Sequence, residues 1–430
     1  MNLRVITTAR ELAWQEGAYA PGIAKDVNLR LGHERHQTWE GWGGCFNELG
    51  WIALSALSAD RRETVLRALF DPADGCRFNL CRLPIGASDY STEWYSYNET
   101  DGDLAMRHFT IARDQRYLFP YIRAALAMRP DIKFFSSPWS PPTWMKAPRA
   151  YNYGTLIWRV EILRAYALYL AKYVQAYHQE GIRVEQVHLQ NEPVADQKFP
   201  SCLWTGEQMR DFIRDYLGPI FSELGLNCEI WLGTLNTIDY DGFVNTALSD
   251  PDTYRFISGV GLQWDGKVMV QRVYAAWPEK RIMQTENECG NGQNTWEYAH
   301  HVFGLLQHYI SNGASAYAYW NMVLAPMGLS TWGWKQNSMV TINPETQVVT
   351  YNPEFYVMKH FSRFIMPGAV RVGVSGCLAA NAVAFENPDR TQVTVIANPL
   401  KIERLCVLGD GQNFVRLVLP PESFNTVMRF

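Results

Sequence analysis

The chain of 430 residues lacks the signals that mark exported and membrane-spanning proteins. Its opening residues contain no apolar segment of the length that a signal peptide needs. No window approaches the roughly 18 apolar residues of a membrane span. We therefore expect a cytoplasmic protein without a membrane span, or a secreted one if a leader segment has been removed.

Signals for nucleic acids, metals and disulfides are equally scarce. The net charge is -4 and no basic tract is present, so no electrostatic footprint for nucleic acid exists. The eight cysteines are scattered, which favours reduced thiols over a disulfide framework. Cys76 and Cys81 have no nearby His or Cys pair, and His300, His301 and His308 do not form an H-E-x-x-H motif. We predict no metal site.

Aromatic residues, in contrast, are abundant, with 16 Trp, 22 Tyr and 20 Phe. Many of them belong to a core, which a chain of this length can build. Flat rings also stack on the apolar faces of sugars, so the excess favours a carbohydrate ligand. Apolar residues make up 47% and charged residues 19%, which is ordinary for a globular protein.

Strand-like and helix-like segments alternate through the middle of the chain. The helical patterns cover residues 60–70, 117–128, 160–177, 206–224, 295–311 and 353–364. The strand patterns, several of them nearly continuous apolar runs, cover residues 42–46, 77–82, 132–136, 184–190, 229–233, 258–263, 281–285 and 316–320. Eight such repeats predict a (β/α)₈ TIM barrel of the α/β class. A doubly wound sheet usually has fewer repeats and a Gly-rich phosphate loop, which is not found here.

Both ends of the chain differ from this pattern. Short alternating runs at 377–385, 392–397, 404–408 and 414–419 are separated by turn signals and predict antiparallel strands. Strand-like pieces also occur at 3–6 and 27–31. We predict an attached β-sandwich side domain built from residues 1–35 and 367–430, beside a catalytic barrel of residues 36–366.

Two of the predicted barrel strands end in a glutamate. The run 187–193 ends in Asn191-Glu192-Pro193, and residues 281–286 end in Glu286. An α/β barrel collects catalytic groups at the carboxyl ends of its strands. Paired carboxyls indicate glycosidic bond cleavage, with a separation of roughly 5–5.5 Å for retention and 6.5–9.5 Å for inversion. Alternatively, either glutamate caps a helix or forms a structural ion pair.

The neighbours of the two glutamates suggest their roles. The Asn191 amide precedes Glu192 and can bind a sugar hydroxyl beside the reacting carbon, which suits an acid/base. Glu286 is then the nucleophile. Glu288 is the rival, since it would share a face with Glu286 if the strand continued, but residues 287–290 have the composition of a loop.

Further candidates gather at the same predicted rim. Arg82 ends a strand and can hold the nucleophile ionised, although it could also be a surface arginine. Asp89 and Tyr90 follow in a loop suited to binding sugar hydroxyls, with a turn cap as the alternative for Asp89. Tryptophans that can serve as sugar platforms or as core residues are Trp139, Trp144, Trp264, Trp320, Trp332 and Trp334.

Several motifs in order along the chain resemble glycoside hydrolase family 30, which contains glucocerebrosidase and bacterial β-glycosidases. The motifs are Arg82-Leu83-Pro84, Ser88-Asp89-Tyr90-Ser91, the proline-rich segment 137–146, Asn191-Glu192-Pro193, the segment 204–213 and Trp320-Asn321-Met322. The resemblance implies a barrel with attached β-structure and a retaining mechanism without a cofactor. It also implies Glu192 as acid/base and Glu286 as nucleophile. Arg82, Asp89, Trp139, Asn191 and Trp320 would line the subsite for the terminal sugar.

One departure from the family pattern concerns Trp264-Asp265. The glucocerebrosidase branch has a Trp-Tyr pair here, so Asp265 removes a phenol beside the nucleophile and affects the sugar preference. We predict a retaining β-glycosidase that removes a β-glucosyl unit from a glycoside or glycolipid. The alternatives are a β-xylosidase or endo-β-1,6-glucanase of the same family and, from another class, a non-catalytic carbohydrate-binding barrel. The sequence carries no signal for an oligomeric state.

Overall fold

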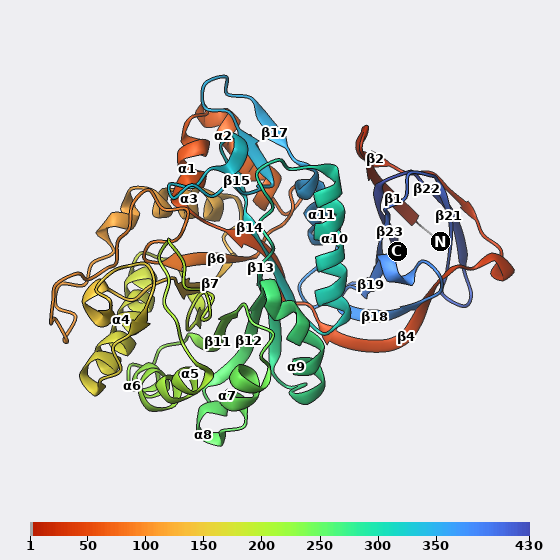
Figure 1. Ribbon diagram of the computed structural model, residues 1–430. Coiled ribbons are helices and arrows are strands. Elements are labelled where there is room, and N and C mark those ends of the chain that lie inside the picture. The colour runs from red at the N-terminus through yellow and green to blue at the C-terminus, as the bar shows by residue number, and fades with distance from the viewer. Residues whose placement is uncertain (1–2) are drawn as a thin grey trace.

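Eight parallel strands close into a barrel in the computed structural model, which describes residues 3–430 (Figure 1). The strands are β5 (Gly41–Cys45), β6 (Leu80–Ile85), β7 (Lys133–Pro138), β10 (Val184–His188), β11 (Glu229–Leu235), β12 (Ile257–Gln263), β13 (Arg281–Glu286) and β14 (Ala316–Asn321). They pair in that order, and β14 closes the barrel against β5. The predicted TIM barrel is therefore confirmed.

The second barrel strand differs from its prediction. It begins at Leu80 and continues to Ile85, so Arg82 lies inside the strand and the expectation that it ends there was wrong. Pro84 is tolerated because β5 pairs with β6 only at Cys45 and Arg82, so the missing N–H has no partner to lose on that side. Arg82 is consequently anchored by regular backbone pairing.

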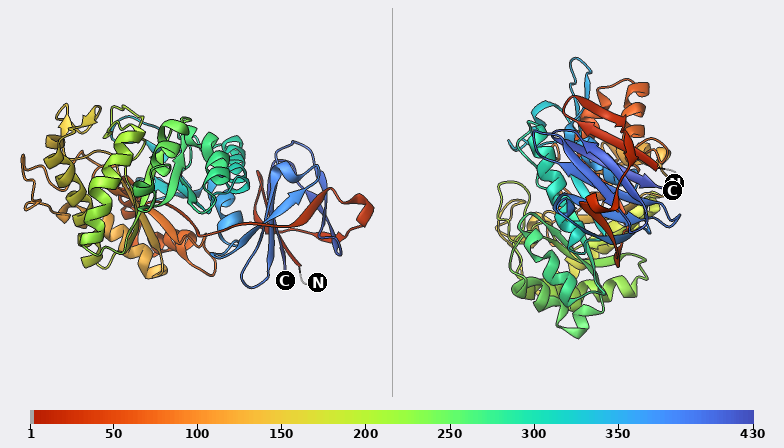
Figure 2. Two further views of the ribbon diagram at one scale, coloured as in Figure 1. Left: turned by 90° about the horizontal axis from the view of Figure 1, so that it is seen from below. Right: turned by 90° about the vertical axis from the view of Figure 1, so that its right-hand side faces the viewer.

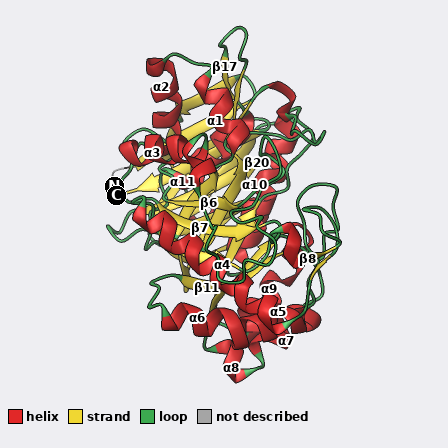
Figure 3. Cartoon of the chain, turned by 90° about the vertical axis from the view of Figure 1, so that its left-hand side faces the viewer, coloured by secondary structure: helices red, strands yellow, loops and turns green. Residues whose placement is uncertain are grey.

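Helices surround the barrel (Figure 3). They are α1 (Glu48–Ser55), α2 (Ala59–Phe70), α3 (Leu118–Met128), α4 (Val160–Gln179), α5 (Gly206–Phe212), α6 (Gly218–Glu223), α7 (Thr246–Leu248), α8 (Pro251–Tyr254), α9 (Val270–Ala276), α10 (Trp296–Ser311) and α11 (Pro353–Ser362). The longest, α4, buries Leu163, Ala167 and Leu170 against the barrel, as its periodicity predicts. No helix within residues 3–430 combines the length and apolarity that crossing a bilayer requires.

The predicted helix over residues 206–224 is interrupted. It begins as expected with a capping box between Thr205 and Gln208, but residues Ile213–Leu217 form a π-helical turn before α6. Pro219 near the start of α6 has no N–H to donate, which breaks the regular hydrogen-bond pattern of the preceding turn. One predicted helix is therefore two.

A ten-stranded sheet forms the side domain, with strands from both chain ends (Figure 2). In spatial order these are β2 (Leu12–Glu16), β1 (Leu3–Ala9), β23 (Ser423–Arg429), β20 (Gln392–Asn398), β19 (Ala382–Glu386), β18 (Val370–Ser375), β4 (Leu29–Thr38), β21 (Arg404–Gly409), β22 (Phe414–Leu419) and β3 (Tyr19–Pro21). The prediction that both ends build this domain is confirmed.

Two strand predictions in the side domain were wrong in extent. The piece at 27–31 belongs to a strand that continues to Thr38. The run 377–385 is not one strand, because Gly376 turns the chain with a φ of 108° and a 3₁₀ turn over Ala379–Asn381 precedes β19. The strand β18 before that glycine had been missed.

The side domain packs on the last two helices of the barrel. Buried His360 of α11 hydrogen-bonds Thr8 of β1 at 3.0 Å and Thr426 of β23 at 2.8 Å. The Trp296 indole of α10 donates to the Glu422 carbonyl at 2.7 Å. Both chain ends thus lie in a domain that is fastened to the outer helices of the barrel (Figure 2).

Candidate active site

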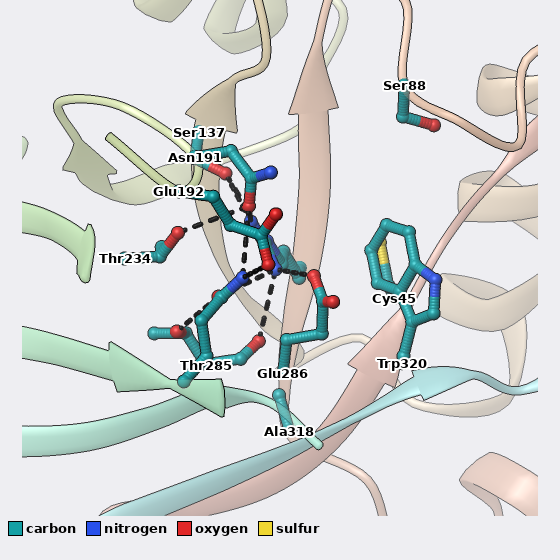
Figure 4. A network of polar contacts seen from close by, with 12 residues as sticks. Cys45, Ser88, Ser137, Asn191, Glu192, Thr234, Thr285, Glu286, Ala318 and Trp320 are labelled. Carbon is teal, nitrogen blue, oxygen red and sulfur yellow. Dashed lines mark hydrogen bonds and ion pairs between the residues drawn. The ribbon is translucent and has the colours of Figure 1, made fainter. Parts of the chain in front are cut away.

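A cavity of about 290 Å³ opens at the carboxyl ends of the barrel strands. Glu286 is the last residue of β13, whereas Glu192 lies beyond the end of β10 at His188, so only one of the two ends a strand as predicted. Both glutamates lie in the cavity, and their carboxyl groups face one another across a hydrogen-bonded cluster (Figure 4). Among the predicted site residues, those lining the cavity are Asp89, Trp139, Asn191, Glu192, Trp264, Asp265 and Glu286. The structure therefore brings together residues from five separate strand ends and loops.

Arg82 is the centre of the cluster and is fully buried. Its guanidinium donates to Glu286 Oε2 at 2.7 Å, to Asn191 Oδ1 at 2.6 Å and to Ser137 Oγ at 2.8 Å. Its Cζ also lies 4.6 Å from the centre of the Trp139 ring. A buried cation needs such partners, so this arrangement excludes the alternative of a surface arginine.

Two amides complete the cluster. Asn191 Oδ1 accepts from Arg82, from Thr234 Oγ1 at 3.2 Å and from Gln263 Nε2 at 3.2 Å. These contacts all fall on the oxygen, and the amide nitrogen points toward the cavity (Figure 4). Gln263 Nε2 also donates to Glu192 Oε1 at 3.1 Å. The two amides and Arg82 therefore connect the two glutamates.

Glu286 is surrounded by hydrogen-bond donors. Besides Arg82 on Oε2, its Oε1 accepts from the Trp264 indole at 3.1 Å and from the Cys289 thiol at 3.7 Å. Burial raises the pKa of Glu286, but Arg82, Trp264 and Cys289 all oppose that rise by stabilising the anion. Burial also raises the pKa of the Cys289 thiol, which keeps it a donor.

Glu192 has a different environment. Burial and the negative charge of Glu286 raise its pKa, and Gln263 is the only side chain that hydrogen-bonds its carboxylate among the described residues. A carboxyl with a raised pKa carries a proton near neutral pH, which is what a general acid requires.

The backbone is strained at two positions of the site. Glu192 has a φ of 51° and Trp264 a φ of 47°, in the left-handed region that residues with a side chain rarely adopt. Each such residue costs of order 1–3 kcal/mol and persists only where its surroundings fix it. Both strained residues place a side chain at the pair of carboxyls.

Asp89 and Tyr90 occupy different places although they are neighbours. Asp89 is buried at the cavity wall, and its Oδ1 has no hydrogen-bond partner within residues 3–430. Burial, together with the charge of Glu286, raises its pKa to about 8. The Tyr90 hydroxyl instead donates to the Gly328 carbonyl at 2.6 Å, and the residue does not line the cavity.

Some of the candidate tryptophans line the cavity and others do not. Trp139, Trp264 and Trp334 line the cavity. Trp320 stacks on Trp139 with 5.5 Å between ring centres, and its buried indole N–H has no partner among the described residues. Trp144 and Trp332 lie outside the cavity lining.

The two acidic residues near Glu286, Asp265 and Glu288, have different positions relative to the cavity. Asp265 lies at the cavity rim with 75% of its side chain exposed. Glu288 does not line the cavity and pairs with Lys267 and His301, each at 2.7 Å. Its side chain is therefore directed away from the cluster that surrounds Glu286.

Sequence reasoning missed several residues that the structure places at the site. Gln263 ends a predicted strand, so the polar terminal residue was a usable signal. The others come from loops and have no local pattern that marks them: Gln197, Phe199, Asn236, Cys289 and Gln336. Within residues 3–430, His, Cys, Asp and Glu side chains form no group of three or more that could hold a metal ion.

The fold and the paired carboxyls define a carbohydrate-cleaving barrel enzyme, and comparison with known proteins gives its family. Residues 39–365 match the glycosyl hydrolase family 30 TIM-barrel domain, and residues 368–427 match the family's β-sandwich domain. The chain belongs to glycosyl hydrolase family 30 and is a glycoside hydrolase. The resemblance stated from the motifs is thereby confirmed.

Relatives within the family carry different substrate names. A putative glucosylceramidase 3 of Caenorhabditis elegans is 29% identical over 92% of this chain and 80% of its own length. The crystal structure of SrfJ from Salmonella typhimurium superposes with a TM-score of 0.90 at 26% identity, covering 100% of this chain and 99% of that one. The endo-β1,6-glucanase BT3312 superposes with a TM-score of 0.88 at 25% identity, covering 99% of each chain.

Proposed function

We propose that the protein is a retaining β-glycosidase that releases β-linked glucose, with Glu286 as nucleophile and Glu192 as acid/base. The observation that carries this proposal is the unequal supply of donors to the two facing carboxyls. Three side chains stabilise the anion of Glu286, whereas burial and repulsion favour the protonated form of Glu192.

In the first step, Glu192 gives its proton to the glycosidic oxygen while the Glu286 carboxylate attacks the anomeric carbon. The bond between that carbon and the oxygen breaks, the alcohol leaves, and a covalent glycosyl-enzyme forms. Arg82 keeps Glu286 ionised and oriented for this attack.

In the second step, the ionised Glu192 takes a proton from water, and the resulting hydroxide attacks the anomeric carbon. The bond to Glu286 breaks and the sugar leaves with its original anomeric configuration. Loss of the first product removes the proton from the site, so the same carboxyl serves as acid and then as base.

Recognition of the sugar would use groups whose bonding capacity is unfilled. The unpartnered Asp89 Oδ1 can accept hydrogen bonds from sugar hydroxyls, and the Asn191 amide nitrogen can donate to one. The Trp139 ring on the cavity wall offers an apolar face for the pyranose. Together they favour a terminal sugar with several free hydroxyls.

Endo-acting β-1,6-glucan cleavage is the second candidate, because further polar side chains line the cavity. Gln197, Asn236 and Gln336 lie there beside Trp334. Such a lining suits a hydroxylated leaving group, and the similarity to an endo-β1,6-glucanase supports the same reading.

A substrate panel with product analysis by NMR tests both candidates. We expect turnover of nitrophenyl β-glucoside, with the β-anomer of glucose as first product. Cleavage of β-1,6-glucan oligomers without turnover of monosaccharide reagents would replace the first candidate by the second. A first product with inverted configuration would overturn the proposed mechanism.

A further inference from the structure

The turn that follows β12 brings Trp264 to the nucleophile. It is the 3₁₀ segment η6 (Trp264–Met269), and the Trp264 indole donates to Glu286 Oε1 at 3.1 Å. Trp264 has a strained φ of 47°, so the intrinsic preference of its backbone does not favour this conformation. The residue is also 36% exposed, so deep burial does not hold its side chain in position. Besides the buried Gly266 and Met269, a further contact holds this turn in place.

Lys267 supplies that contact from within the same turn. Its Nζ donates to the Trp264 carbonyl at 3.3 Å and to Glu288 Oε1 at 2.7 Å. The Lys267 carbonyl in turn contacts His308 Nε2 of α10 at 2.8 Å. The lysine therefore connects the backbone of Trp264 to groups outside the turn.

Glu288 accepts the hydrogen bond from Lys267 and is itself held by residues of α10. Its Oε2 contacts His301 Nε2 of α10 at 2.7 Å, and its backbone carbonyl accepts from the Tyr298 hydroxyl at 2.7 Å. The hydrogen bond with His301, followed by that with Lys267, lowers the pKa of Glu288 to about 2 against the effect of burial. The side chain is only 19% exposed, so solvent screens these pairs incompletely.

We propose that Glu288 is a positioning residue, which holds the Trp264 indole against Glu286 through Lys267. This inference rests on the proposed function, because it concerns how the nucleophile is kept ionised. Glu288 follows the nucleophile by two residues, so it fixes the turn after β12 relative to the end of β13. The glutamate that competed with Glu286 as nucleophile in the sequence thereby acquires a separate role.

The direct effect of the indole is measured with Trp264→Phe. Losing a donor to a charged acceptor should lower kcat/KM roughly tenfold. It should also move the acidic limb of the pH profile to higher pH, because the Glu286 anion loses a stabilising bond. Glu288→Gln should shift the limb in the same direction and lower kcat/KM about fivefold.

The decisive test is the double variant Glu288→Gln/Trp264→Phe. If Glu288 acts through Trp264, the double variant should fall no more than about twofold below Trp264→Phe alone. Losses that multiply fully would overturn the proposal, and so would a Glu288→Gln variant with the kinetics of the unmodified enzyme. Lys267→Met should reproduce the Glu288→Gln effect, and Lys267→Arg should restore most of the lost activity.

A matched control separates positioning from general stability. Glu386 in the side domain also pairs with two basic residues, Arg35 at 3.2 Å and Arg390 at 2.8 Å, and its side chain is 17% exposed. Glu386→Gln removes a comparable pair far from the cavity. It should leave both kcat/KM and the acidic limb unchanged, and a shift equal to that of Glu288→Gln would overturn the proposal.

Hydrogen exchange gives a readout that does not depend on turnover. In Glu288→Gln the amides of residues 264–269 should exchange faster, whereas those of α4 should not change. Unchanged exchange in this turn would overturn the proposal. If the unmodified enzyme cleaves none of the panel substrates, the proposed function fails, and the exchange experiment still decides whether Glu288 holds the turn.

Discussion

Glu286 at the end of β13 and Glu192 beyond the end of β10 face the same cavity, but the two carboxyls have different hydrogen-bond donors around them. At β13, Arg82, Trp264 and Cys289 all donate to Glu286. Beyond β10, Glu192 receives a single side-chain hydrogen bond, from Gln263. Burial raises the pKa of both glutamates, but more donors oppose that rise at Glu286 than at Glu192, and such a difference lets one site hold both a base and an acid.

The comparison is tested most severely by Glu286→Gln. We expect a loss in kcat of about 10⁴-fold or more for every substrate, because the variant lacks the carboxylate that attacks the anomeric carbon. The variant should keep its fold, as checked by circular dichroism. Glu288→Gln, for which a loss of only about fivefold is expected, is the neighbouring comparison, and retention of activity in Glu286→Gln together with a loss of about 10⁴-fold in Glu288→Gln would reverse the nucleophile assignment.

Glu192→Gln should give a loss that depends on the leaving group. Substrates with poor leaving groups need the proton, so their kcat/KM should fall about 10²- to 10⁴-fold. Formation of the glycosyl-enzyme from dinitrophenyl β-glucoside, whose leaving group needs no proton, should be nearly unchanged. Single-turnover kinetics separate the two steps.

The pH profile of the same variant supplies its control. Because the pKa of Glu192 is raised, the general acid is present near neutral pH and is lost as pH rises through that pKa. The alkaline limb of kcat/KM should therefore disappear in Glu192→Gln, measured with the activated substrate. Survival of that limb would mean that another group is the acid.

Asp89 is a third buried carboxyl in the cavity, and like Glu192 it has few hydrogen-bond donors to stabilise its anion. Its pKa of about 8 in the folded protein exceeds the usual unfolded value of about 3.9, so between these values the unfolded chain ionises while the folded protein keeps its proton, and stability falls as pH rises. Asp89→Asn should raise Tm by roughly 1–3 °C at pH 7.5 and leave it unchanged at pH 3.5.

Activity should change in the opposite direction, since the asparagine cannot accept as many sugar hydroxyls. We expect kcat/KM to fall about 10- to 100-fold. A thermal melt at the two pH values, combined with the kinetics, checks both parts. Equal Tm gains at both pH values would show that charge burial is not the cause.

Tyr90→Phe should have the smallest effect. The hydroxyl binds the Gly328 carbonyl and touches neither glutamate, so kcat/KM should stay within about twofold while stability falls by about 1 kcal/mol. A tenfold rise in KM would instead restore Tyr90 to the sugar-binding set that the sequence indicates.

The sequence was sufficient for the barrel and for the two glutamates because both depend on local pattern. Several of the eight strands are nearly continuous apolar runs, and Glu192 and Glu286 are marked by the end of such a run. Arg82 was found for the same reason, although its strand continues past it to Ile85. A site residue on a strand can therefore be identified from the sequence even when the predicted end of the strand is wrong by a few residues.

What could not be predicted depends on contacts between distant segments. Gln263 acts on Glu192 across 71 residues of sequence, and no periodicity encodes that pairing. Likewise, the spacing of Glu286 and Glu288 cannot tell which one faces the cavity. That outcome depends on Lys267 and His301, which lie on other elements. The side-chain environment, and hence the pKa, is a tertiary property.

The pairing of β1 with β23 has a consequence for synthesis of the chain. Leu3 of β1 is matched with Arg429, so β1 leaves the ribosome long before the strand with which it pairs. Until then β1 has only the hairpin with β2, and its other edge is unpaired. Completion of the side sheet is therefore a late, long-range event, and the newly made barrel carries an open strand edge that favours association with chaperones or with other unfinished chains.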